Sequence, residues 1–117
     1  MNDFKIKIRE QSDVQIIDLK GYLDAHTASE FEQTMQKLIN EKKFNILVNC
    51  KNLSYISSAG LGVFMAYIEE VRKYKGDIKL ANMPPKIYNV FDILGFPLIY
   101  EIYNNEEEAL KKFLKKS

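Results

Sequence analysis

The chain offers few side chains from which a catalytic centre could be built. Its one histidine, His26, and its one cysteine, Cys50, lie far apart in the sequence, which excludes most zinc sites and His-dependent triads. Neither G-x-x-x-x-G-K-[ST] nor G-x-G-x-x-G occurs. Three candidate carboxylates, Asp18, Asp24 and Asp92, fall in unrelated segments. We therefore expect no enzyme activity, no cofactor and no metal site.

The most distinctive segment is LSYISSAGLGVF at residues 53–64, which leads from a predicted central strand into a helix. Ser58 has the residue type of a helix N-cap, whose side chain accepts hydrogen bonds from N–H groups one turn ahead. A phosphate on Ser58 would meet the same N–H groups and the positive end of the helix. Capping and modification are therefore both open to this hydroxyl.

Gly60 and Gly62 lie in the first turns of the same helix, where a glycine costs about 0.5–1 kcal/mol relative to alanine. Two explanations have equal weight. The missing side chains would let a partner or a kinase approach the backbone beside Ser58, or they would let the helix pack tightly against the sheet.

Hydrophobic periodicity predicts the elements that hold this segment. Strands are predicted at residues 4–9, 14–19, 44–48, 78–80 and 98–103. Helices are predicted at residues 28–41, 58–75, 85–94 and 104–114. Strands that alternate with helices after a hairpin indicate an α/β fold with a mixed sheet.

Some boundary residues and stripes carry specific expectations. Thr27 and Glu30 form a predicted capping box, Asn104 a predicted cap, and Gly76 a predicted helix stop. The core-facing helical stripes include Met65 and Leu94. Four lysines, Lys111, Lys112, Lys115 and Lys116, are expected to complement the dipole of the last helix.

Length and composition predict one domain over residues 1–117, since 117 residues with 46% hydrophobic content suffice for a single core. The net charge of +1 provides no field for nucleic acid or an anionic membrane. A lone cysteine, expected to be half-buried, and the lack of a leader or a spanning segment favour the cytoplasm.

Residues 53–64 and Gly21-Tyr22-Leu23-Asp24 resemble the STAS domain of anti-sigma-factor antagonists, in which a D-S-[ST]-G-L-G stretch carries the phosphorylated serine. Gly60-Leu61-Gly62 matches directly, and Ser58 takes the phosphoacceptor place, with Ser57 as second choice. The sequence departs from the family pattern at Ala59, and also at Ser57 and Asn49, where aspartate is common. The resemblance implies a four- to five-stranded mixed sheet flanked by about four helices.

The resemblance also implies a partner-switching cycle. The unmodified protein would bind an anti-sigma factor that is also a serine kinase supplying ATP and Mg²⁺, and would thereby release a sigma factor. Phosphorylation of Ser58 would end this binding, and a serine phosphatase would restore it. The alternative is a constitutive STAS-like scaffolding or interaction module without phosphate control.

The expected partner surface joins the loop before the first helix to the start of the second. Its members are Gly21, Tyr22, Leu23, Asp24, Tyr55, Ser57, Ser58, Ala59, Gly60, Leu61 and Gly62. Tyr22 and Tyr55 are expected as aromatic anchors, or alternatively as sheet residues. Asp24 would either contact a partner or hold the local loop.

Overall fold

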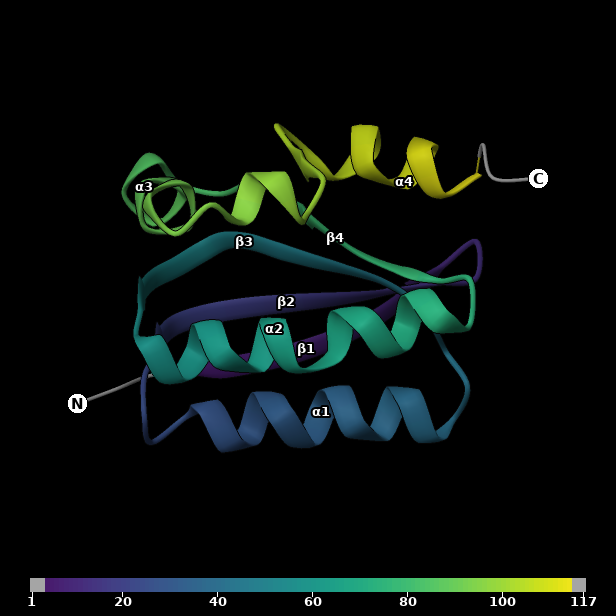
Figure 1. Ribbon diagram of the computed structural model, residues 1–117, viewed down its shortest axis with the longest axis horizontal. Helices are drawn as coiled ribbons and strands as arrows, with labels where there is room; N and C mark the ends of the chain where they lie inside the picture. Colours follow the sequence, from purple (N-terminus) through teal and green to yellow (C-terminus); the bar gives the residue numbers. More distant parts are fainter. Residues whose placement is uncertain (1–3, 115–117) are drawn as a thin grey trace.

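A mixed five-stranded sheet forms the centre of the computed structural model, which describes residues 4–114 (Figure 1). The strands are β1 (Lys5–Gln11), β2 (Val14–Leu23), β3 (Asn45–Ile56), β4 (Asp77–Ala81) and β5 (Ile102–Tyr103). The helices are α1 (Ala28–Asn40), α2 (Ser58–Lys73), α3 (Pro85–Ile93) and α4 (Glu106–Leu114), with a 3₁₀ turn, η1 (Phe96–Leu98). The predicted α/β class and the numbers of strands and helices are confirmed; Lys115 and Lys116 lie outside the described residues.

The strand order is β1-β2-β3-β4-β5. β1 is antiparallel to β2, and the hairpin turns at Ser12 and Asp13, whose φ values are 53° and 65°. The remaining neighbours are parallel, which requires crossover connections, and each crossover contains a helix. Parallel β2 and β3 therefore end on the same edge of the sheet.

The helices build a separate core on each face of the sheet. Figure 1 shows α1 and α2 running side by side along the sheet. On their face, Phe64 contacts Phe31 and Phe91 edge-on, with ring centroids 5.0 and 5.4 Å apart. The smaller core lies under α4 and comprises Val14, Ile16, Leu47, Ala81, Ala109, Leu110 and Phe113. β3 is covered on both faces, as its apolar run predicts.

Two strands extend beyond their predicted ends. β2 continues through Gly21, whose φ is 93°, to Leu23, and β3 continues from Val48 to Ile56. The pairing of these strands shifts register twice, between Asp18 and Lys20 and between Gly21 and Tyr22. These irregularities let polar residues and a glycine remain in the paired strands. From the sequence pattern alone, the same residues indicate that the strands have ended.

Several helix-end predictions are wrong. Asn105, and not Asn104, accepts a hydrogen bond at 2.8 Å from the Glu108 N–H at the start of α4. Gly76 is not the left-handed stop of α2, because Lys75 takes the positive φ of 68°. A Cβ on Gly76 would lie 2.0 Å from the carbonyl oxygen of Phe44, so glycine is required there for close approach of the backbones.

Core predictions also fail at particular positions. Met65 and Leu94 are exposed, although each belongs to an apolar stripe. Residues 98–103 form the end of η1 and the two-residue strand β5 instead of one longer strand. Cys50 is fully buried, and burial raises the pKa of its thiol to about 12, so the reactive thiolate is suppressed.

A charged network fixes the start of α4 to the sheet. The Arg9 guanidinium donates to both oxygens of Asp18 at 2.7 and 2.8 Å and to Glu106 at 2.7 Å. The Asn49 amide also donates to Glu106, at 2.9 Å. Hydrogen bonding from Arg9 is the largest influence on the pKa of Glu106 and, with Asn49, lowers it despite the opposing effect of burial. The network thus connects three strands to α4.

Acidification should weaken this network. Because the folded-state pKa of Glu106 lies below its ordinary value of 4.5, the stability it contributes is present above that value and is lost as pH falls through the lowered pKa. Between about pH 5 and pH 3, the free energy of unfolding of Glu106→Gln should fall less steeply than that of wild type, as measured by urea unfolding. The exposed neighbour provides a control, Glu107→Gln, which should keep the wild-type slope. Equal slopes in all three proteins would contradict this role of Glu106.

Candidate partner-binding site

The two predicted segments of the partner surface meet at the edge where β2 and β3 end. Leu23 pairs with Ile56, and the Ser57 N–H donates to the Leu23 carbonyl oxygen at 2.9 Å. This bond places the loop before α1 directly beside the start of α2. The structure therefore brings together residues that are about thirty positions apart in the chain.

Ser57, and not Ser58, is the N-cap of α2. Its φ and ψ are −98° and 173°, and its Oγ accepts a hydrogen bond from the Gly60 N–H at 3.3 Å. Ser58 is the first helical residue and is exposed, whereas Ser57 is half-buried. The one-residue difference from the sequence prediction arises because β3 runs up to Ile56. The capping role and the accessible hydroxyl thus belong to two different serines.

The two glycines of α2 have different surroundings, and tight packing explains only one of them. A Cβ on Gly60 would lie 2.7 Å from Leu23 Cγ and 3.1 Å from Ile56 Cγ1, which explains glycine by tight packing. A Cβ on Gly62 would meet nothing within 4 Å, and Gly62 is exposed. Packing therefore does not explain Gly62, and the approach of a partner beside it stays a prediction.

Asp24 organises the loop before α1. Its Oδ1 accepts hydrogen bonds from the N–H groups of His26 at 3.0 Å and Thr27 at 3.1 Å. Burial opposes ionisation, but these bonds outweigh it and lower the pKa of Asp24. The predicted capping box is wrong, because the Thr27 hydroxyl donates to the Tyr22 carbonyl oxygen at 2.8 Å and makes no side-chain cap bond. Both side chains therefore shape the loop.

Tyr22 and Tyr55 form an exposed aromatic pair beside the loop. They face each other across the β2–β3 pairing, with ring centroids 5.5 Å apart. Each is a sheet residue, yet their exposed fractions are 51% and 43%. A tyrosine pair held in this way offers apolar area to a partner at little loss of side-chain entropy.

The predicted surface residues lie at different depths. Leu23, Gly60 and Leu61 are buried and support the surface from below. Gly21, Asp24 and Ser57 are half-buried. The residues open to solvent are Tyr22, Tyr55, Ser58, Ala59 and Gly62.

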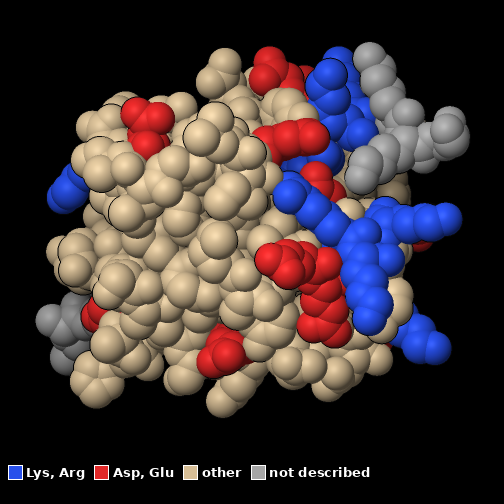
Figure 2. Space-filling model, in the orientation of Figure 1, with Lys and Arg blue, Asp and Glu red and all other residues tan. Residues whose placement is uncertain are grey.

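An apolar surface on α3 and η1 was missed by the sequence analysis. We call it the α3 surface; it comprises Tyr88, Ile93, Leu94 and Leu98, all exposed. Ile93 and Leu98 are 83% and 92% exposed. Figure 2 shows a broad uncharged area at the end of the molecule where α2 begins and α3 lies, with charged side chains gathered toward the other end. The sequence contains one indication of this surface, because Ile93 lies off the apolar stripe that contains Ile87 and Phe91.

Asn49, one of the departures from the family pattern, lies far along β3 from the start of α2. It occupies the middle of the strand and donates to Glu106 under α4. An aspartate there would place a second carboxylate against Glu106. The residue therefore serves the sheet–α4 contact.

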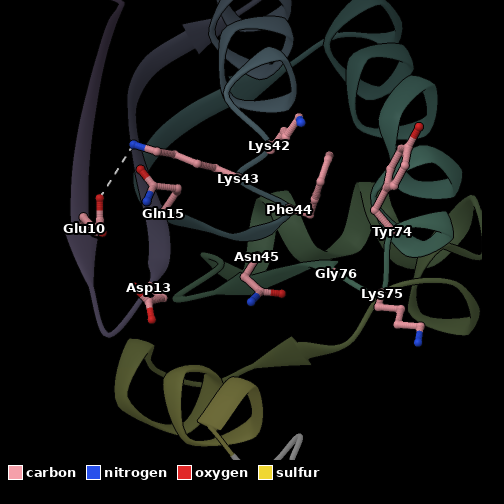
Figure 3. Close-up of a pocket in the computed structure, with 10 residues that line it drawn as sticks. All are labelled: Glu10, Asp13, Gln15, Lys42, Lys43, Phe44, Asn45, Tyr74, Lys75 and Gly76. Carbon is pink, nitrogen blue, oxygen red and sulfur yellow. Dashed lines mark ion pairs between the residues drawn. The ribbon is translucent and has the colours of Figure 1, made fainter.

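A hollow of about 340 Å³ lies at the opposite end of the sheet (Figure 3). Lys43 Nζ forms an ion pair with the Glu10 carboxylate at 3.8 Å. The rings of Phe44 and Tyr74 stack with their centroids 4.6 Å apart. The side chains in Figure 3 point in different directions and do not converge on one centre. This hollow contains none of the predicted site residues.

Further chemistry is sparse within residues 4–114. No three His, Cys, Asp or Glu side chains in this range converge as a metal site would require. None of the helices there has the length and apolarity needed to span a bilayer.

The fold and the predicted partner surface together define a small α/β domain whose candidate site is an exposed surface. The STAS domain family matches residues 5–109, and the chain belongs to this family. It is 28% identical over 109 residues to the anti-sigma F factor antagonist of Paenibacillus polymyxa, covering 92% of this chain and 93% of that protein. It is 29% identical over 103 residues to the anti-sigma-B factor antagonist of Bacillus subtilis, covering 88% and 93%.

Solved structures agree on the fold. The anti-sigma factor antagonist SpoIIAA in its unphosphorylated form superposes with a TM-score of 0.79 at 24% identity, covering 93% of this chain and 94% of that one. The phosphorylated form of Bacillus SpoIIAA superposes with a TM-score of 0.72 at the same 24% identity, covering 93% and 97%.

The two glycines of α2 should respond oppositely to alanine. Gly60→Ala should lower the free energy of unfolding by about 1–3 kcal/mol, because the new methyl group overlaps Leu23 and Ile56. Gly62→Ala should raise it by about 0.5–1 kcal/mol, because it meets no neighbour and improves helix propensity. Urea unfolding of both variants measures this difference. Similar changes in the two proteins would rule out the assignment of Gly60 to packing and Gly62 to an open surface.

Proposed function

We propose that this protein is an anti-sigma-factor antagonist that binds an anti-sigma factor acting also as a serine kinase. Binding would release a sigma factor, and phosphorylation of Ser58 would end the binding. The observation that carries the proposal is the exposed Ser58 hydroxyl at the first position of α2, separated from the capping role by Ser57. The curated relatives named anti-sigma factor antagonists support the same role.

The partner would cover the end of the molecule around the start of α2. The exposed tyrosine pair, the open backbone at Gly62 and the neighbouring α3 surface supply aromatic and apolar area there. Interfaces of this kind place aromatic anchors at the centre and exclude water around them. Ser58 lies between Tyr55 and Gly62 in the chain, so its state of modification would be read directly by the partner.

A phosphate on Ser58 would act locally. It adds about −1.5 to −2 charges, which the first-turn N–H groups and the helix dipole accommodate without unfolding. On association, the partner would have to cover this charge and remove its hydration shell, which costs free energy unless the partner supplies an opposite charge. The modified protein would therefore keep its fold and lose its partner.

In this scheme the protein performs no catalysis. The partner kinase supplies ATP and Mg²⁺, and a serine phosphatase removes the phosphate. We propose that the cycle runs in the cytoplasm, with no direct contact to nucleic acid or membrane.

The second candidate is a constitutive STAS-like scaffolding or interaction module. The observation that favours it is Ser57 in the place of the common aspartate, which leaves no acid beside Ser58 for a kinase to use. Helix capping argues against this candidate, since serine caps a helix about as well as aspartate does. The Ser57–Gly60 bond retains this capping function.

Charge substitution at Ser58 should separate the two candidates. Against an anti-sigma-factor kinase from the same organism, Ser58→Asp should raise the Kd at least about tenfold, because a carboxylate is desolvated in the contact. Ser58→Ala should stay within about threefold of wild type. Calorimetry or surface plasmon resonance measures both. A matched control is Ser29→Asp, another exposed serine in the first turn of a helix, α1. Equal affinities of the Ala and Asp variants would favour the scaffolding module.

Modification can be tested on the wild-type protein. After incubation with the same kinase and ATP, mass spectrometry should find phosphate on Ser58 and not on Ser57, whose Oγ is engaged with the Gly60 N–H. Ser57→Ala should still be modified, and Ser58→Ala should not. If the kinase binds while both serines stay unmodified, phosphate control of this protein is excluded.

A further inference from the structure

The α4 face of the sheet is only partly covered. α4 packs over Val14, Ile16 and Leu47, and the charged network at Glu106 marks the end of its coverage. Beyond that point, a shallow groove of about 380 Å³ opens over β1, β2 and β3. Four exposed lysines line it: Lys5, Lys7, Lys20 and Lys51. We call this the basic groove.

The basic groove continues toward the tyrosine pair. A second hollow of about 510 Å³ shares Lys20, Lys51 and Asn52 with the first and extends to Tyr22 and Ser54. The two hollows therefore adjoin and extend the basic groove along the sheet. Lys20 and Lys51 lie in its middle, and Tyr22 lies at one end.

The positive charge of the groove has little compensation. Asp18 is the one carboxylate that lines it, and both oxygens of Asp18 accept hydrogen bonds from Arg9. Within residues 4–114, no carboxylate forms an ion pair with any of the four lysines. The whole chain has a net charge of only +1, so this is a local concentration of charge.

Fold stability does not explain these lysines. Lys5 and Lys20 pair directly across β1 and β2, and like charges in this arrangement destabilise a sheet. Lysines on an edge strand protect against aggregation, which accounts for Lys5 and Lys7 on β1. Lys20 and Lys51 lie on the inner strands β2 and β3, where no edge needs protection.

We propose that the basic groove binds an acidic segment of a partner protein. The lysines complement its carboxylates, and the exposed amide of Asn52 can pair with its backbone. Tyr22 offers apolar contact to one end of the segment. Nucleic acid fits less well, because the groove holds no exposed arginine to grip phosphate with two bonds and the chain has no strong overall field. This proposal does not depend on phosphorylation of Ser58.

The test uses a fluorescein-labelled twelve-residue peptide of alternating Glu and Ser with one Phe at its end, titrated with protein and followed by anisotropy. Lys20→Gln/Lys51→Gln should raise the Kd about fivefold or more, since two charge contacts are lost. The control, Lys37→Gln/Lys86→Gln, makes the same net-charge change on exposed lysines of α1 and α3 and should shift the Kd less than twofold.

Thermal unfolding adds a readout that separates binding from structure. Lys20→Gln/Lys51→Gln should be as stable as wild type or more stable, because it removes the Lys5–Lys20 repulsion. A clear loss of stability would assign these lysines to the fold and overturn the proposal. Absence of peptide binding, or equal losses in the two double variants, would also overturn it. Tighter binding of a single-stranded oligonucleotide or of anionic vesicles, lost in the groove variant, would replace the acidic segment with that ligand.

Discussion

The candidate site depends on the parallel pairing of β2 and β3 at their last residues. The Ser57 N–H reaches the Leu23 carbonyl oxygen, and Gly60 then packs its backbone against the side chains of Leu23 and Ile56. No other residue fits at position 60 without moving the leucine. This contact sets where α2 begins, and the start of α2 in turn sets which serine hydroxyl is engaged and which is exposed.

The two faces of the sheet serve different purposes because the helices cover them unequally. α1, α2 and α3 seal one face with a large aromatic core, whereas α4 covers the other only as far as the Arg9–Glu106 network. The edge where β2 and β3 end lies next to both. The Tyr22–Tyr55 pair therefore borders the start of α2 on one side and the basic groove on the other. A partner that contacts the tyrosines is in reach of both surfaces.

Most of the fold followed from the sequence, because hydrophobic period is set by the geometry of helices and strands. The site was less predictable. The one-residue shift of the N-cap from Ser58 to Ser57 arises from ladder pairing between β2 and β3, which is a contact between distant segments. The different roles of Gly60 and Gly62 depend on whether Leu23 lies beneath them, and no local pattern records this.

Family patterns were informative where they reflect packing and less so where they reflect charge. Gly60-Leu61-Gly62 combines one buried glycine, one core leucine and one open glycine, and packing explains the first two. Asn49 stands where aspartate is common, and its amide donates to Glu106, which a second carboxylate would repel. Ser57 stands where a second aspartate is common, and its Oγ still caps α2 by accepting from the Gly60 N–H. Ser58 is exposed in a chain that carries both replacements, so the accessible hydroxyl that the proposed phosphate switch needs is present here.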